Sequence, residues 1–144
     1  MHVDSNHNCA ASATSIASDL INDARIATIG LATGRSVESF YVHLLQAHYG
    51  NHINLSPCHF LMLDEYIGLP PGDNRLFKEQ LESSFLSNIL KKTGHFIYPD
   101  SSISDQDKMV QQFATKSGEF NVNLQILGIG RNGHLGFNEP GSTS

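Results

Sequence analysis

The strongest constraint on the fold of this chain is the alternation of short aliphatic runs with longer segments whose apolar residues recur at helical spacing. Residues 26–32 (IATIGLA), 60–63 (FLML) and 122–127 (VNLQIL) have the length and composition of buried strands. Strands that alternate with helices in this way are typical of parallel βαβ units. We therefore expect an α/β fold, with a Rossmann-like, doubly wound and mostly parallel sheet flanked by helices.

Four segments beside these runs carry apolar residues three or four positions apart, which predicts amphipathic helices. The clearest is residues 74–90, where an apolar side chain returns every fourth position. Residues 68–72 (GLPPG), just before it, predict a loop. The side chains that we expect to face the core are, helix by helix, Ile16, Leu20 and Ile21; Val37, Phe40, Tyr41, Leu44 and Leu45; Phe77, Leu81, Phe85 and Ile89; and Met109, Val110 and Phe113.

The organisation of the chain predicts one domain. Its 144 residues, 40 % of them hydrophobic and 16 % charged, have the size and balance of an ordinary globular unit. There is no internal repeat, low-complexity tract or linker, so we expect residues 1–144 to form a single domain. No helical pattern follows residues 122–127 to cover the sheet there, and we expect the sheet to be incomplete at the C-terminus.

Charge and residue spacing argue against several classes of partner. A formal net charge of -5 with nine Lys and Arg does not suit nucleic acid, which needs clustered cations. No stretch approaches the roughly 18 apolar residues of a membrane span, and no secretory leader is evident, so we expect a cytoplasmic protein. The eight histidines lack the HxxxH or HExxH spacing of a metal site, and no metal is expected. Cys9 and Cys58 are interpreted as reduced thiols, and the sequence leaves a homo-oligomer open.

The first strand leads directly into Thr33, Gly34, Arg35 and Ser36, and then into a helix. Ligands of open α/β sheets bind outside the carboxyl ends of the strands, so each such junction is a candidate site. A turn of small residues before a helix leaves backbone N–H groups at the positive end of the helix dipole, which suits a phosphate. The alternative is that Thr33 or Ser36 only caps the helix.

The second strand ends in two adjacent carboxylates, Asp64 and Glu65. Adjacent side chains on a strand point to opposite sides, so one can face the crevice while the other pairs elsewhere or faces solvent. Asp64 follows four apolar residues directly and is the better candidate for a partly desolvated base with a raised pKa. The alternative is an acid that ends the strand by capping the loop.

The third strand is followed by glycines at positions 128, 130 and 133, and then by His134 and Glu139. The GxGxxG spacing alone is weak evidence for a dinucleotide site. An imidazole and a carboxylate on one short glycine-rich loop are more informative, because a neighbouring carboxylate fixes the tautomer of a histidine and tunes it as a base. A buried structural histidine is the alternative.

Three motifs together resemble the glucosamine-6-phosphate deaminase family in order and spacing: residues 30–36 (GLATGRS), 63–70 (LDEYIGLP) and 127–142 (LGIGRNGHLGFNEPGS). The related 6-phosphogluconolactonases share the fold but typically carry Asp-Glu-Arg at the second junction and GHTASLFP at the third. Tyr66 and residues 137–140 (FNEP) favour the deaminase branch. The resemblance covers somewhat more than the front half of the family's domain.

The resemblance implies conversion of glucosamine 6-phosphate and water to fructose 6-phosphate and ammonia, without a cofactor. In that reaction the sugar ring opens, a task that the resemblance gives to His134, supported by Glu139 and Asn132. Asp64 matches the base that removes the proton from C2. By the same resemblance the substrate and its phosphate are bound by Thr33, Gly34, Arg35, Ser36 and Gly133.

Three positions depart from the family pattern, one of them Val37, which stands where the family often carries Pro. Some members carry Asp where Asn132 stands, and a neutral amide can orient His134 but cannot stabilise its charged form, which leaves that role to Glu139. Arg35 replaces a small residue, so it either adds a cation to the phosphate site or fills part of it. The alternatives to the deaminase are a non-catalytic fragment that binds sugar phosphates and a hydrolase of the 6-phosphogluconolactonase kind.

Overall fold

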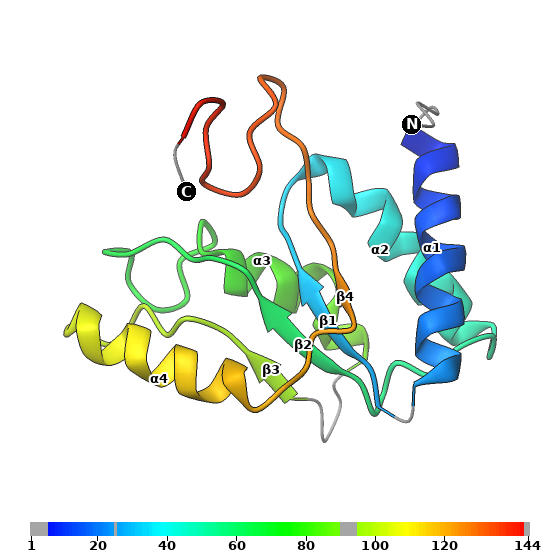
Figure 1. The fold of residues 1–144 in the computed structure, drawn as a ribbon, viewed down its shortest axis with the longest axis horizontal. Helices are drawn as coiled ribbons and strands as arrows, with labels where there is room; N and C mark the ends of the chain where they lie inside the picture. Colours follow the sequence, from blue (N-terminus) through cyan, green and yellow to red (C-terminus); the bar gives the residue numbers. More distant parts are fainter. Residues whose placement is uncertain (1–5, 25, 90–94, 143–144) are drawn as a thin grey trace.

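The computed structural model describes residues 6–24, 26–89 and 95–142, which form a four-stranded sheet in the order β3-β2-β1-β4 (Figure 1). All three pairings are parallel, which confirms the predicted sheet. The strands are β1 (Thr28–Leu31), β2 (His59–Met62), β3 (His95–Ile97) and β4 (Leu124–Gln125).

Helices flank the sheet, and the chain crosses the sheet in two directions. The helices are α1 (Asn6–Asp23), α2 (Arg35–Tyr49), α3 (Phe77–Ser84) with a short 3-10 helix, η1 (Leu86–Asn88), and α4 (Gln106–Gly118). Through α2 and α3 the chain moves outward from β1 to β3, and through α4 it returns to the other side of β1. Because parallel crossovers are right-handed, α4 lies on the sheet face opposite α2 and α3. The winding direction therefore reverses between β1 and β4, as expected for a doubly wound fold.

The core lies between the sheet and the helices α1, α2 and α3. Every residue of β1 is buried, and the α2 residues predicted to face the core are buried except Leu45, which is partly buried. Tyr41 also ties α2 to the end of β1, since its hydroxyl accepts a hydrogen bond from the Ala32 N–H (3.1 Å) and donates one to the Ala32 carbonyl (2.6 Å). The start of α2 is thereby fixed against the carboxyl end of β1.

The helix predicted for residues 74–90 is shorter and interrupted. Asp73 accepts hydrogen bonds from the backbone and side chain of Arg75, which holds the residues before Phe77 in a turn. At the other end Phe85 leaves the helical conformation, with φ -128° and ψ -60°, and the chain continues as η1. The four-residue spacing was nevertheless a correct guide to burial, because Leu81, Phe85 and Ile89 are all buried; Leu90 lies outside the described residues.

The core-facing side of α1 was predicted wrongly. Ile16 is 59 % exposed and Leu20 is 36 % exposed, and only Ile21 is buried as expected. The buried side is instead formed by small residues, among them Ala10 and Ala17, which let α1 pack closely on α2. The largest apolar side chains therefore did not mark the packed face of this helix.

The strand predicted for residues 122–127 is assigned only over β4, because side-chain bonds replace part of its ladder. Asn123 pairs with Thr28 through its own N–H (2.9 Å) and through its side-chain oxygen, which accepts the Thr28 N–H (2.8 Å). The Ile126 N–H then donates to the Gly30 carbonyl (2.9 Å). The chain thus follows β1 for longer than the assigned strand.

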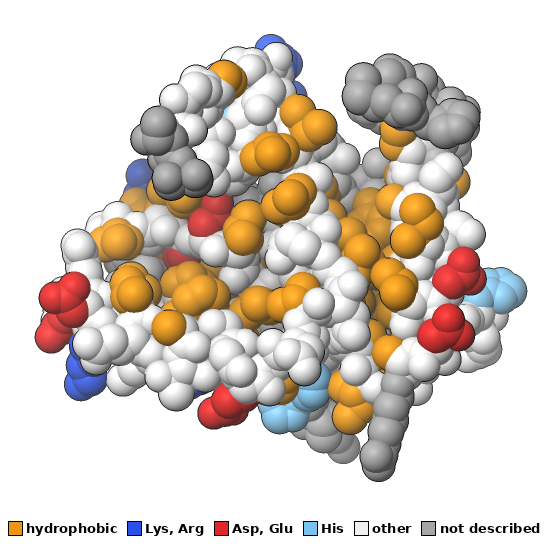
Figure 2. Space-filling model, viewed as in Figure 1, with side chains coloured by type: hydrophobic (Ala, Val, Ile, Leu, Met, Phe, Trp, Pro, Cys, Tyr) orange, Lys and Arg blue, Asp and Glu red, His pale blue; other side chains and the backbone are white. Residues whose placement is uncertain are grey.

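One face of the molecule carries many exposed hydrophobic side chains, which Figure 2 shows between α1 and the segment around β4. Leu127 and Ile129, directly after β4, are 48 % and 68 % exposed. Within residues 6–24, 26–89 and 95–142, no helix is long and apolar enough to span a membrane.

Candidate functional site

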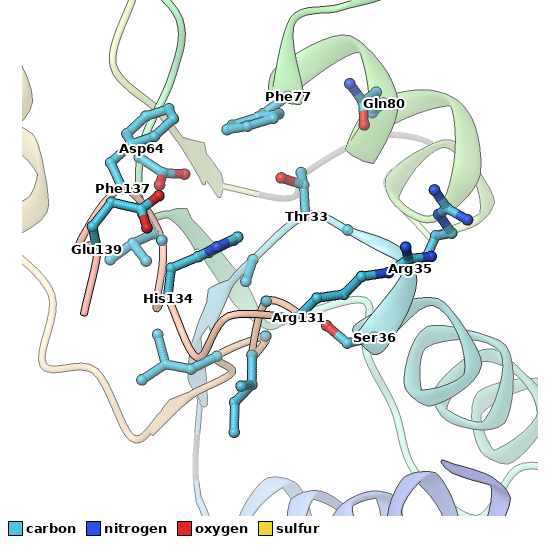
Figure 3. Close-up of a pocket in the computed structure, with 18 of the residues that line it drawn as sticks. Thr33, Arg35, Ser36, Asp64, Phe77, Gln80, Arg131, His134, Phe137 and Glu139 are labelled. Carbon is cyan, nitrogen blue, oxygen red and sulfur yellow. The ribbon is translucent and has the colours of Figure 1, made fainter.

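A pocket of about 770 Å³ opens at the carboxyl ends of β1, β2 and β4 (Figure 3). This is the edge of the sheet, beside the reversal of winding, where doubly wound folds bind ligands. The lining comes from the loops after these three strands and from the first turns of α2 and α3. The lining residues are Ala32–Ser36, Leu63, Asp64, Tyr66, Phe77, Gln80, Leu127–Arg131, His134, Gly136, Phe137 and Glu139.

At the first junction, α2 begins at Arg35 with its N-terminus against the pocket. Gly34 is the N-cap and has a φ of 114°, a conformation that side-chain-bearing residues rarely adopt. As a glycine, this N-cap residue has no side chain that could cap the helix. The first-turn N–H groups of an α-helix lack carbonyl partners within the helix, so this end suits an anion.

At the second junction the two acids take different roles. Asp64 lines the pocket, whereas Glu65 turns to the start of α3. The Glu65 carboxylate accepts hydrogen bonds from the N–H groups of Tyr66 (2.8 Å), Phe77 (2.9 Å) and Lys78 (2.9 Å). The capping role that the sequence left open for this pair therefore falls to Glu65, and Asp64 remains for the pocket.

The position of Asp64 changes its acidity. Partial burial raises the pKa of the Asp64 carboxyl group above its usual value, and the negative charge of Glu65 raises it further. No hydrogen bond to this carboxyl group comes from the part of the chain that the structure describes. A carboxylate of raised pKa that faces an open pocket is suited to accept a proton from a bound molecule.

Each glycine of the GxGxxG spacing has a local structural reason. A Cβ on Gly128 would lie 2.7 Å from the Ser36 hydroxyl oxygen, so this glycine lets the third loop meet the start of α2. A Cβ on Gly130 would overlap the His134 ring. Gly133 has a φ of 88° and closes a turn by donating its N–H to the Gly130 carbonyl (3.0 Å). Gly128 thus allows the third loop to pack against the start of α2, and Gly130 and Gly133 allow the His134 ring to take its position.

Three side chains of the third loop form a hydrogen-bonded series from His134 through Asn132 to Glu139. The His134 Nδ1 lies 2.7 Å from the Asn132 Oδ1, and the Asn132 Nδ2 donates to the Glu139 Oε2 at 2.6 Å. A carboxylate only accepts, so the amide must present its nitrogen to Glu139 and its oxygen to His134. An amide oxygen also only accepts, so the His134 Nδ1 carries the proton. In the neutral ring Nε2 then keeps the free lone pair.

The structure brings most of the predicted site residues together. Seven of them line the pocket: Thr33, Gly34, Arg35, Ser36, Asp64, His134 and Glu139. The other two, Asn132 and Gly133, are not in the lining; Asn132 bonds to His134 and Glu139, and Gly133 closes the turn that holds them. Figure 3 shows Asp64, Glu139 and His134 on one side of the pocket and Arg35 on the other.

Sequence reasoning missed an aromatic wall and a cation. The rings of Tyr66, Phe77 and Phe137 contact one another, with centroid distances of 4.7, 5.4 and 5.9 Å. They join the second loop, the start of α3 and the third loop, a contact that no local pattern could reveal. The cation is Arg131, whose position inside the third motif was the available signal.

A metal centre would need several ligating side chains close together. Among the residues whose structure is described, no three His, Cys, Asp or Glu side chains form such a group.

A family model described as glucosamine-6-phosphate isomerases/6-phosphogluconolactonase matches residues 3–136. A glucosamine-6-phosphate deaminase of Rhodococcus opacus is 35 % identical over 116 residues, which are 80 % of this chain and 45 % of that protein. The chain spans about half the length of the curated relatives it matches.

Solved structures also resemble the fold, among them a glucosamine-6-phosphate deaminase and a 6-phosphogluconolactonase. A monomeric glucosamine-6-phosphate deaminase has a TM-score of 0.86 at 29 % identity, over 99 % of this chain and 60 % of that one. A 6-phosphogluconolactonase from Trypanosoma brucei has a TM-score of 0.74 at 15 % identity, over 96 % of this chain and 62 % of that one, and bears on the fold alone. The family match covers most of the chain and agrees with the three sequence motifs. The chain therefore belongs to the family of glucosamine-6-phosphate isomerases and 6-phosphogluconolactonases.

Proposed function

We propose that this protein converts glucosamine 6-phosphate and water to fructose 6-phosphate and ammonia. The observation that carries the proposal is the pairing, in one pocket, of a carboxyl group of raised pKa, Asp64, with a histidine whose Nε2 is left free, His134. An aldose-to-ketose conversion needs both groups. One moves a proton from the anomeric hydroxyl to the ring oxygen, and the other removes a proton from C2.

Ring opening is assigned to His134. Its Nε2 accepts the proton of the anomeric hydroxyl and returns it to the ring oxygen as the C1–O5 bond breaks. While the ring is protonated, its Nδ1–H remains bonded to Asn132, and Glu139 lies one hydrogen bond further away.

The second proton transfer is assigned to Asp64. Its carboxylate removes the proton from C2 of the open-chain aldehyde, which gives an enolamine as the C1 oxygen takes up a proton, and Asp64 then delivers the proton that it removed to C1. The product is an imine at C2, which water hydrolyses to the ketone and ammonia. Each such proton transfer contributes about 10²–10⁴ in rate.

The opposite end of the pocket is assigned to the phosphate. The start of α2 presents backbone N–H groups there, and Thr33, Arg35 and Ser36 line the same end. Because the acids Asp64 and Glu139 lie on the other side, the pocket has a cationic and an acidic end (Figure 3). That separation suits a substrate with a phosphate at one end and an amine-bearing carbon near the other.

A coupled assay for ammonia release from glucosamine 6-phosphate tests the proposal. We expect release by the wild-type chain, a fall of about 10²-fold or more in Asp64→Asn, and retained substrate binding in that variant. Asp107→Asn, an exposed change on α4, is the matched control and should keep wild-type activity.

The outcomes separate the alternatives. Ammonia release undiminished in Asp64→Asn would refute the assignment of the base. Hydrolysis of 6-phosphogluconolactone without ammonia would favour the lactonase, and binding of sugar phosphate without turnover would favour a non-catalytic binding protein.

A further inference from the structure

Arg131 and Asn132 are the two central residues of one tight turn. The Gly133 N–H donates to the Gly130 carbonyl at 3.0 Å, and the Gly130 N–H donates to the His134 carbonyl at 2.9 Å. From this turn Asn132 reaches His134 and Glu139. The neighbouring side chain, Arg131, extends in another direction, toward the start of α2 (Figure 3).

Arg131 and Arg35 both line the pocket where α2 begins. No carboxylate in the described part of the chain forms an ion pair with either guanidinium. Two guanidinium groups and a helix N-terminus thus share one end of the pocket without a compensating negative charge. Such an arrangement is relieved by a bound anion, and a guanidinium offers paired N–H donors that match a phosphate.

We propose that Arg131 binds the phosphate of the substrate and that this contact also fixes the orientation of His134. The inference rests on the proposed function and adds a residue to it. Since Arg131 precedes Asn132 in the same turn, a phosphate that holds Arg131 also holds the peptide group that carries Asn132. The Asn132 amide in turn sets the tautomer and direction of the imidazole.

This coupling predicts a difference between phosphorylated and unphosphorylated sugars. Glucosamine 6-phosphate engages Arg131 and orders the turn, whereas glucosamine reaches only the acidic end of the pocket. Recognition of the phosphate is therefore linked to the position of the group that opens the ring.

Calorimetric titration of the whole chain with glucosamine 6-phosphate, inorganic phosphate and glucosamine tests the inference. In Arg131→Ala we expect affinity for the two phosphate-bearing ligands to fall by about tenfold or more, as for loss of a charge-assisted hydrogen bond. Arg131→Lys should lose less, because it keeps the charge but not the paired donors. Arg75→Ala, which removes an exposed arginine paired to Asp73 away from the pocket lining, is the matched control and should bind like wild type.

NMR signals of the His134 ring supply a readout that a loss of affinity alone would not change. Saturating inorganic phosphate should shift them in the wild-type chain and leave them unshifted in saturated Arg131→Ala. Equal phosphate affinity in Arg131→Ala and wild type, or an equal shift of the ring signals, would overturn the inference while leaving the proposed function standing. Failure of the wild-type chain to bind glucosamine 6-phosphate would overturn both.

Discussion

The side-chain amide of Asn132 stands between His134 and Glu139, accepting from the one at 2.7 Å and donating to the other at 2.6 Å. Where a family member carries Asp at this position, the charge contacts the imidazole directly; here it lies one hydrogen bond further away, on Glu139. The tautomer of His134 therefore depends on a neutral amide. The hydrogen bond to Glu139 decides which end of that amide faces the imidazole.

Replacing Asn132 tests whether this hydrogen-bonded series from His134 to Glu139 supports catalysis. In Asn132→Leu the imidazole loses its acceptor, and we expect ammonia release to fall by about 10²-fold, the lower part of the range for general acid–base catalysis. Asn132→Asp keeps an oxygen for His134 but sets two carboxylates against each other, which must share a proton or separate. It should therefore be more active than Asn132→Leu, and equal activity of the two variants would contradict a catalytic role of this series.

The raised pKa of Asp64 predicts a pH dependence. The base acts as a carboxylate, so the rate should fall as the pH drops through a value above the ordinary aspartate pKa of about 3.9. The check is the acid limb of the kcat/KM profile; a limb at or below the ordinary value would contradict the assignment.

The same shift affects stability with a definite sign. Because the folded state holds the Asp64 proton more tightly than the unfolded chain, the Asp64 contribution to stability falls as the pH rises from about 3.9 through the raised pKa. Asp64→Asn should therefore unfold at a higher temperature than wild type at neutral pH. This advantage should vanish below the ordinary pKa, where the carboxyl group is protonated in both states.

Gly130 predicts an effect on activity that is separate from stability. The Cβ of alanine would overlap the His134 ring, and the ring is the part that can move. We expect Gly130→Ala to reduce ammonia release on the order of 10²-fold through misplacement of the imidazole, with little change in the melting temperature. Gly118→Ala, at the end of α4 with open space around its Cβ position, is the control and should leave activity unchanged.

Replacing Glu65 should mainly lower the stability of the fold. Glu65→Ala leaves the Tyr66 N–H and two N–H groups at the start of α3 without their acceptor, and we expect a loss of about 1–3 kcal/mol in urea unfolding. Glu79→Ala removes an ion pair with Lys78 and an acidic side chain from the first turn of α3, but no acceptor of a backbone N–H, and should cost less than about 1 kcal/mol. Similar losses in the two variants would contradict the capping role.

Much of this arrangement could be predicted because its causes are local. The aliphatic runs around Ile29 and Phe60 form a fully buried and a partly buried strand, and a parallel sheet places the residues after them, Thr33 to Ser36 and Asp64, at one edge. The third motif carried enough specific residues to indicate both a site and a family.

The errors arose where contacts between distant segments decide the structure. The packed side of α1 is formed by alanines because α2 lies close, which the larger Ile16 and Leu20 concealed. Asp64 faces the pocket while Glu65 binds the start of α3, and this difference depends on where α3 lies in the fold. Arg131 matters only because the third loop folds beside the start of α2.

The loop after β4 closes largely upon itself. Between Gly130 and Ser142 its backbone hydrogen bonds join residues only three or four positions apart, whereas Ile126 is still bonded to β1. Breaking such short-range bonds does not require the sheet to separate, so this segment can open in a local fluctuation. Amide hydrogens of Gly133 and Leu135 should then exchange with solvent far faster than that of Ile29 within β1. The imidazole would lose its alignment at a free-energy cost well below that of unfolding the strands beneath it.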